Sequence, residues 1–135
     1  MEGYHIVVVG IGAMGGGMAR NLLSSSITAQ VTGYDMRKDS TERFFSDSLR
    51  LNKAPTSPPS SLSDAIEGKT EFVVLSLVNE AQCDQVCFKD EKNLLNLMPT
   101  RSCVILTSTV TGMLPTAALL VFVVFLLSLT SLPWS

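Results

Sequence analysis

The chain has 135 residues, 46% of them hydrophobic, which suits one domain with a modest core and excludes two full domains. Its formal charge of -2 provides no basic surface for a phosphate backbone, so we expect no nucleic-acid partner. Three cysteines without a CxxC pair, and a single histidine, argue against both a disulfide framework and a metal site. Reduced thiols, and an amino terminus without the basic region of a signal peptide, favour a cytoplasmic location.

Short apolar strands and helical patterns alternate along the chain. Strands are expected over residues 4–9, 30–34, 71–77 and 104–107. Helices are expected from Met14 to the serines at 24–26, over 40–51, over 64–67 under a Ser63 and Asp64 cap, and from 79 or 80 to 88. This alternation predicts βαβ crossovers and therefore an α/β fold with a doubly wound parallel sheet.

Two local features qualify this pattern. The Pro/Ser-rich stretch 53–63 cannot hold a regular helix or a central strand, so it is predicted to be a surface loop. In the helix 40–51 the spacing predicts Phe44, Phe45 and Leu49 on one buried face.

A glycine motif joins the first strand to the first helix. Gly10, Gly12 and Gly15 form G-x-G-x-x-G, the pattern of dinucleotide-binding turns. Gly10 would allow a tight turn, Gly12 a close approach of backbone to a pyrophosphate, and Gly15 close packing of helix against strand. The N–H groups and dipole of the helix terminus would then hold the phosphates. The alternative is a glycine turn with a purely structural role.

An acidic residue follows at the spacing that such sites require. Asp35 lies 20 residues after Gly15, at the end of the second strand, where a carboxylate can accept from the ribose hydroxyls of NAD. The same carboxylate would repel the extra phosphate of NADP, but Arg37 and Lys38 follow closely. The cofactor is therefore predicted to be NAD or NADP, with NAD slightly favoured by Asp35. A solvated turn residue is the alternative interpretation of Asp35.

The residues around the glycines carry a family resemblance. The run from Val8 to Leu22 resembles the amino-terminal signature of the β-hydroxyacid dehydrogenases, the family of 3-hydroxyisobutyrate dehydrogenase and 6-phosphogluconate dehydrogenase. Ile11 stands where leucine is usual, and four residues match beyond the glycines: Met14, Met18, Ala19 and Asn21. The resemblance implies a truncated Rossmann-type NAD(P)-binding domain over residues 1–112. It also implies an oxidoreductase that, if complete, oxidises a small 3-hydroxy acid by hydride transfer.

The resemblance further implies a set of site residues. Ser108 and Thr109 would offer hydroxyls to the substrate, unless they form a polar strand end satisfied by its own backbone. The cofactor contacts that it implies are Gly10, Ile11, Gly12, Ala13, Met14, Gly15, Asp35, Leu77, Val78, Asn79 and Thr109.

No residue of this chain matches the catalytic position of the family. Family members continue into a helical second domain, where a lysine acts as general acid and base. Here Lys92 is the last lysine and lies in a polar stretch, so no catalytic residue is assigned. Whether the chain alone is an enzyme stays open, and a non-enzymatic nucleotide-binding module is the alternative.

The resemblance ends near Gly112, and residues 113–135 are strongly hydrophobic. No charged residue occurs from Ser102 to Ser135. As a helix, residues 112–134 would reach roughly 34 Å, enough to cross a hydrocarbon core of about 30 Å. Three interpretations stay open: a membrane anchor formed by a hydrophobic helix, a buried strand and helix of the sheet, and a chain end from an altered or incomplete coding frame.

Overall fold

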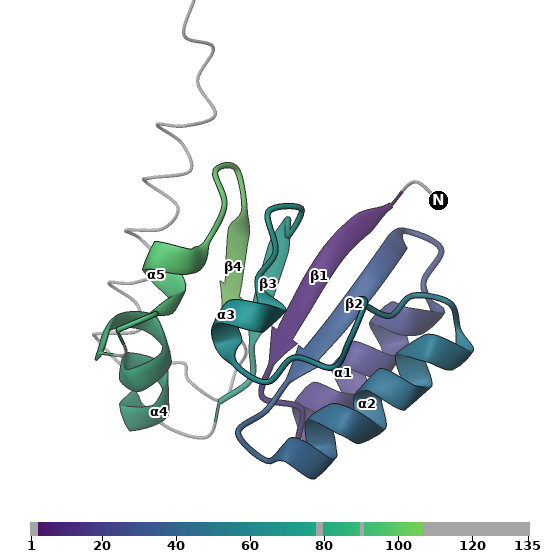
Figure 1. Cartoon of the computed structure of the whole chain (residues 1–135), viewed down its shortest axis with the longest axis horizontal. Helices are drawn as coiled ribbons and strands as arrows, with labels where there is room; N and C mark the ends of the chain where they lie inside the picture. The colour runs from purple at the N-terminus through teal and green to yellow at the C-terminus, as the bar shows by residue number, and fades with distance from the viewer. Residues whose placement is uncertain (1–2, 78–79, 90, 107–135) are drawn as a thin grey trace, which may run out of the picture.

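The structure, a computed structural model, describes residues 3–77, 80–89 and 91–106 (Figure 1). The described part of the chain forms one parallel sheet in the order β2-β1-β3-β4. Its strands are β1 (Tyr4–Val9), β2 (Thr28–Tyr34), β3 (Phe72–Leu75) and β4 (Cys103–Leu106). The prediction of an α/β fold with a Rossmann-type parallel sheet is confirmed.

Helices connect the strands. They are α1 (Ala13–Ser24), α2 (Lys38–Arg50), α3 (Leu62–Ala65), α4 (Glu80–Asp84), the π-helical turn η1 (Gln85–Lys89) and α5 (Leu94–Leu97). Figure 1 shows α1 and α2 beside β1 and β2, with α4 and α5 near β4. None of the helices in the described ranges is long and apolar enough to cross a membrane. The predicted hydrophobic helix at 113–135 lies outside these ranges.

Side chains alternate between two cores, one on each face of the sheet. Ile6 and Val8 of β1 pack with Ala19 and Leu23 of α1 and with Phe44 of α2. On the opposite face, the buried residues come from all the strands except β2 and from the helices α3 to α5: Val7, Val9, Ala65, Val73, Leu75, Cys83, Cys87, Leu94 and Val104. Because both faces are covered at β1 and β3, these two strands are almost continuously apolar, as the sequence of β1 indicated.

β2 begins two residues earlier than predicted. Thr28 pairs with Tyr4, and its Oγ1 donates to the carbonyls of Leu22 at 2.7 Å and Ser25 at 3.1 Å. Since these bonds tie the end of α1 directly to the strand, no separate loop is needed before Gln30.

The predicted face of α2 was partly wrong. Phe44 is buried, but Leu49 is 56% exposed, and the helix packs through Thr41 and Ser48 instead. Ser48 Oγ donates to the carbonyl of Phe44 at 2.9 Å, so this small polar side chain is satisfied within the interface. The helix can therefore lie close to β2.

Two short helices also differ from the prediction. Ser61, not Ser63, caps α3, because its Oγ accepts from the N–H of Asp64 at 3.1 Å. The helix α5 was not predicted; Asn93 caps it, its Oδ1 accepting from the N–H of Asn96 at 3.1 Å.

Candidate functional site

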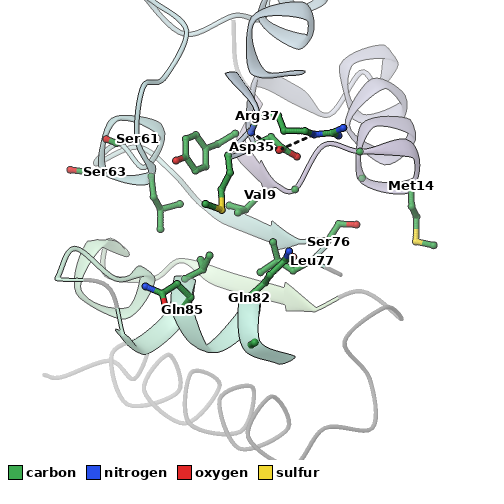
Figure 2. Close-up of a pocket in the computed structure, with 18 of the residues that line it drawn as sticks. Val9, Met14, Asp35, Arg37, Ser61, Ser63, Ser76, Leu77, Gln82 and Gln85 are labelled. Carbon is green, nitrogen blue, oxygen red and sulfur yellow. Dashed lines mark hydrogen bonds and ion pairs between the residues drawn. The ribbon is translucent and has the colours of Figure 1, made fainter. Parts of the chain in front are cut away.

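The strand order changes direction between β1 and β3. The chain moves from β1 outward to β2 and then returns to the other side of β1 to form β3. In open parallel sheets such a switch point leaves a crevice at the carboxyl ends of the strands, and ligands bind there. A pocket of about 1080 Å³ lies at this place, between the residues that follow β1, β2 and β3 (Figure 2).

The glycines of the turn after β1 meet three different constraints. Gly10 has φ +89°, and a Cβ there would overlap the carbonyl oxygen of Ser76. A Cβ on Gly15 would overlap the carbonyl oxygen of Gly10, so helix and turn touch through bare backbone. Around Gly12 only the Arg37 guanidinium comes near, at 3.7 Å from an added Cβ. The space over Gly12 is therefore open to the pocket.

Gly12 is also the N-cap of α1. No side chain caps this end of the helix, and its first turn holds no acidic residue. The first N–H groups of a helix and its dipole attract anions. The uncapped end of α1 beside the open space at Gly12 can therefore receive a phosphate group.

Asp35 connects the end of β2 to the glycine turn. Its Oδ2 accepts from the N–H of Ile11 at 3.0 Å, and its Oδ1 accepts from the N–H of Arg37 at 2.9 Å. Thr41 Oγ1 donates to the Asp35 carbonyl at 3.1 Å, which holds the backbone in place. Asp35 lines the pocket, and a carboxylate oxygen can accept more than one hydrogen bond, so the group can still accept from a ligand.

Two cations lie near this carboxylate. Arg37 Nε lies 3.6 Å from Asp35 Oδ1, with 66% of the side chain exposed. Figure 2 shows this ion pair at the edge of the pocket. Lys38 is more exposed still and pairs with Glu42 at 3.7 Å. This part of the pocket therefore holds a carboxylate and an exposed guanidinium side by side.

The opposite wall comes from segments that the sequence analysis did not assign to the site. It consists of residues from α3, α4, η1 and the turn before α5: Ser61, Leu62, Ser63, Ala81, Gln82, Gln85, Val86 and Lys92. In Figure 2, Gln82 and Gln85 lie across the pocket from Asp35 and Arg37. No local motif marks these residues, because only the packing of α3, α4 and η1 into the core that they share with β1 and β3 brings them here.

Cys83 and Cys87 lie behind that wall. Both thiols are buried, and their sulfur atoms are 3.9 Å apart. The hydrogen bond with Cys83, together with burial, raises the pKa of the Cys87 thiol, which keeps it protonated. These cysteines therefore pack as core residues behind the pocket.

The predicted contact residues divide into three groups. Ile11 does not line the pocket; its side chain is buried against α1, and its N–H serves Asp35. Val78, Asn79, Ser108 and Thr109 lie outside the residues that the structure describes. The predicted residues that line the pocket are Gly10, Gly12, Ala13, Met14, Gly15, Asp35 and Leu77.

Comparison with known families agrees with this geometry. Residues 5–116 match the family described as the NAD binding domain of 6-phosphogluconate dehydrogenase. The chain belongs to this family. The resemblance to β-hydroxyacid dehydrogenases is thereby confirmed, and the chain is an NAD(P)-binding domain of a dehydrogenase and reductase family.

Solved structures share the fold of this NAD(P)-binding domain at low sequence identity. An imine reductase from Aspergillus terreus, in complex with NADPH4 and dibenz[c,e]azepine, is 16% identical with a TM-score of 0.60, over 96% of this chain and 39% of that chain. A reductive aminase from Aspergillus terreus, in complex with NADPH4, cyclohexanone and allyl amine, has the same identity and TM-score, over 95% of this chain and 38% of that one. The chain thus spans about two fifths of the length of these enzymes. No curated protein matches the sequence.

Proposed function

We propose that the pocket after β1 and β3 is where this domain binds its nicotinamide dinucleotide. The pyrophosphate would lie over Gly12 at the uncapped end of α1. One observation carries the proposal: Cβ atoms are excluded by backbone at Gly10 and Gly15 but meet only the Arg37 guanidinium at Gly12. A turn with a purely structural role would not need open space at its middle glycine.

The adenosine ribose is proposed to meet Asp35. This carboxylate is held by two backbone N–H groups and so is oriented before any ligand arrives. Pre-oriented acceptors cost little entropy on binding. The nicotinamide end would then lie along residues 77–79, with Ser108 and Thr109 toward a substrate.

The substrate is proposed to be a small 3-hydroxy acid. The support is the signature from Val8 to Leu22, shared with the β-hydroxyacid dehydrogenases. A bound nicotinamide cofactor would accept the hydride, while residues of this chain would bind and orient it. Residues 1–112 are proposed as the cofactor-binding domain, and 113–135 as a hydrophobic segment outside the cofactor site.

A cytoplasmic location is part of the proposal, because Cys83, Cys87 and Cys103 are free thiols that suit a reducing compartment. A membrane anchor at 113–135, one of three interpretations of that segment, is not part of this proposal.

We further propose that the domain prefers NAD over NADP, but only modestly. Asp35 would repel a 2′-phosphate, while Arg37, at 3.6 Å, offsets part of that charge and could turn toward the phosphate. The two side chains therefore oppose each other in cofactor choice.

Calorimetric titration of the full chain with NAD and NADP tests this balance. Asp35→Asn keeps an acceptor but removes the charge, so it should weaken NAD binding about tenfold and reduce the preference for NAD. Arg37→Ala should weaken NADP binding about three- to tenfold and leave NAD binding nearly unchanged. Lys38→Ala is the matched control, because this lysine pairs with Glu42. Equal effects of all three variants on both cofactors would contradict the proposal.

Turnover separates an enzyme from a binding module. If the full chain oxidises small 3-hydroxy acids with NAD or NADP, the catalytic proposal stands for this chain. If it binds the cofactor without turnover, the chain alone acts as a nucleotide-binding module.

A further inference from the structure

The helices α1 and α2 cover one face of the sheet over β1, β2 and β3, and β4 continues that face beyond them with apolar side chains. Among residues 3–77, 80–89 and 91–106, β4 pairs only with β3. Val104 is buried on the face that α5 covers. Ile105 points to the other face and is 45% exposed, although its neighbour Val74 on β3 is buried. The cover over this face therefore stops between β3 and β4.

The exposed apolar area continues across the sheet. Tyr4 is 43% exposed and packs its ring edge-to-face on Phe72, with centroids 5.2 Å apart. Cys103 pairs with Phe72 and is only half-buried. We call Tyr4, Phe72, Cys103 and Ile105 the open face. Contiguous apolar side chains of this kind mark a surface that another segment covers.

The opposite edge of the sheet shows how this chain protects an edge strand. The N–H of Val31 in β2 donates to the carbonyl of Lys53 at 3.0 Å, and Ser48 Oγ donates to the carbonyl of Val31 at 3.4 Å. The segment after α2 and a side chain of α2 thus satisfy the outer N–H and carbonyl of Val31 in the middle of β2. Unprotected edges invite pairing with other chains, so β4 needs an equivalent cover.

We propose that residues 113–135 of the same chain cover the free edge of β4 and the open face. This segment follows β4 after residues 107–112, six residues that can span about 20 Å. It holds no charged residue, and 117–127 is an unbroken apolar run rich in Val and Phe. Strands that are buried on both faces have such sequences, because neither face meets water. The proposal therefore accounts for two observations: Ile105 is exposed in β4, and the sequence of 117–127 contains no polar residue.

The native thiol of Cys103 can report on this cover in the full-length protein. We expect Cys103 to react slowly with a maleimide while Cys83 and Cys87, both buried, stay unreactive. The double variant Phe122→Asp with Val124→Asp should raise the rate for Cys103 by about tenfold or more. Ser131→Asp, a charge beyond the apolar run, is the matched control and should leave the rate unchanged.

Other occupants give different results, each of which would overturn the proposal. Flotation of the chain with phosphatidylcholine vesicles would make the tail a membrane anchor. Protection of Cys103 that falls on dilution would identify a second copy of the chain. Equal reactivity in all variants would mean that nothing covers the face. Should the double variant fail to fold, hydrogen exchange of the β4 amides in the unaltered chain decides instead: slow exchange supports the cover, and fast exchange at the outer amides contradicts it.

Discussion

At the scale of single residues, the glycines of α1 differ in what a side chain would meet. Gly15 faces the backbone of Gly10, whereas nothing lies within 4 Å of a Cβ added at the exposed Gly17. Glycine inside a helix costs stability, because the unfolded chain loses more freedom there than with alanine. The same residue type is therefore required at one position and unfavourable two residues later.

Gly17→Ala should raise the free energy of unfolding by about 0.5–1 kcal/mol without changing cofactor affinity. Urea denaturation of the full chain measures this change. Gly15→Ala serves as the comparison and should lower stability, because its Cβ would overlap the Gly10 carbonyl. A destabilising effect of Gly17→Ala would contradict the assigned geometry of α1.

A buried lysine joins the end of α1 to the segment after α2. Lys53 Nζ donates to the carbonyl of Ser25 at 2.6 Å and to Thr28 Oγ1 at 2.9 Å. Lys53→Ala should lower the free energy of unfolding by about 2 kcal/mol, because it removes two hydrogen bonds from a charged donor at a buried position. Lys38→Ala, at a highly exposed ion pair, should cost less than about 0.5 kcal/mol. Similar losses for both variants in urea denaturation would contradict a structural role for Lys53.

At the scale of elements, helix caps explain both successes and failures of the sequence analysis. The start of α1 was predicted because Gly12 and the preceding strand form a recognisable motif. The cap of α3 was assigned to Ser63, since several serines compete in the stretch and only the fold selects Ser61. Leu49 was predicted to be buried because it is hydrophobic, but it is exposed. The residues of α2 that are buried beside Phe44 are the small polar Thr41 and Ser48, which hydrophobicity alone does not indicate.

A carboxylate in the first turn of α3 also predicts a pH dependence. Asp64 accepts hydrogen bonds from Ser60, and these bonds lower the pKa of its carboxyl group in the folded chain. Its stabilising contribution is therefore complete above the unfolded pKa of about 3.9 and disappears as the pH falls through the lower folded value. Asp64→Asn should destabilise the protein at pH 6 more than at about pH 2.5, as measured by urea denaturation at both values. A difference that is independent of pH would contradict this contribution.

At the scale of the whole molecule, the pocket depends on topology more than on any motif. The glycine turn and Asp35 were predictable, because strand, turn, helix and acid follow one another locally. The wall formed by Ser61, Gln82 and Lys92 was not, because these residues approach the turn only after the chain crosses over from β2 to β3. One side of the candidate site is thus encoded near one motif, and the other side depends on the order of the strands.

Cofactor binding to Gly12→Val tests the central claim most directly. A Cβ at this N-cap would meet only the Arg37 side chain, so we expect Gly12→Val to fold while its side chain extends into the space proposed for the pyrophosphate. We predict a loss of NAD affinity of about 100-fold or more in calorimetric titration, equivalent to ~2.7 kcal/mol. Gly17→Val, on the exposed side of α1, is the size-matched control and should bind NAD like the unaltered chain. A folded Gly12→Val protein that binds NAD with unchanged affinity would contradict the proposed site.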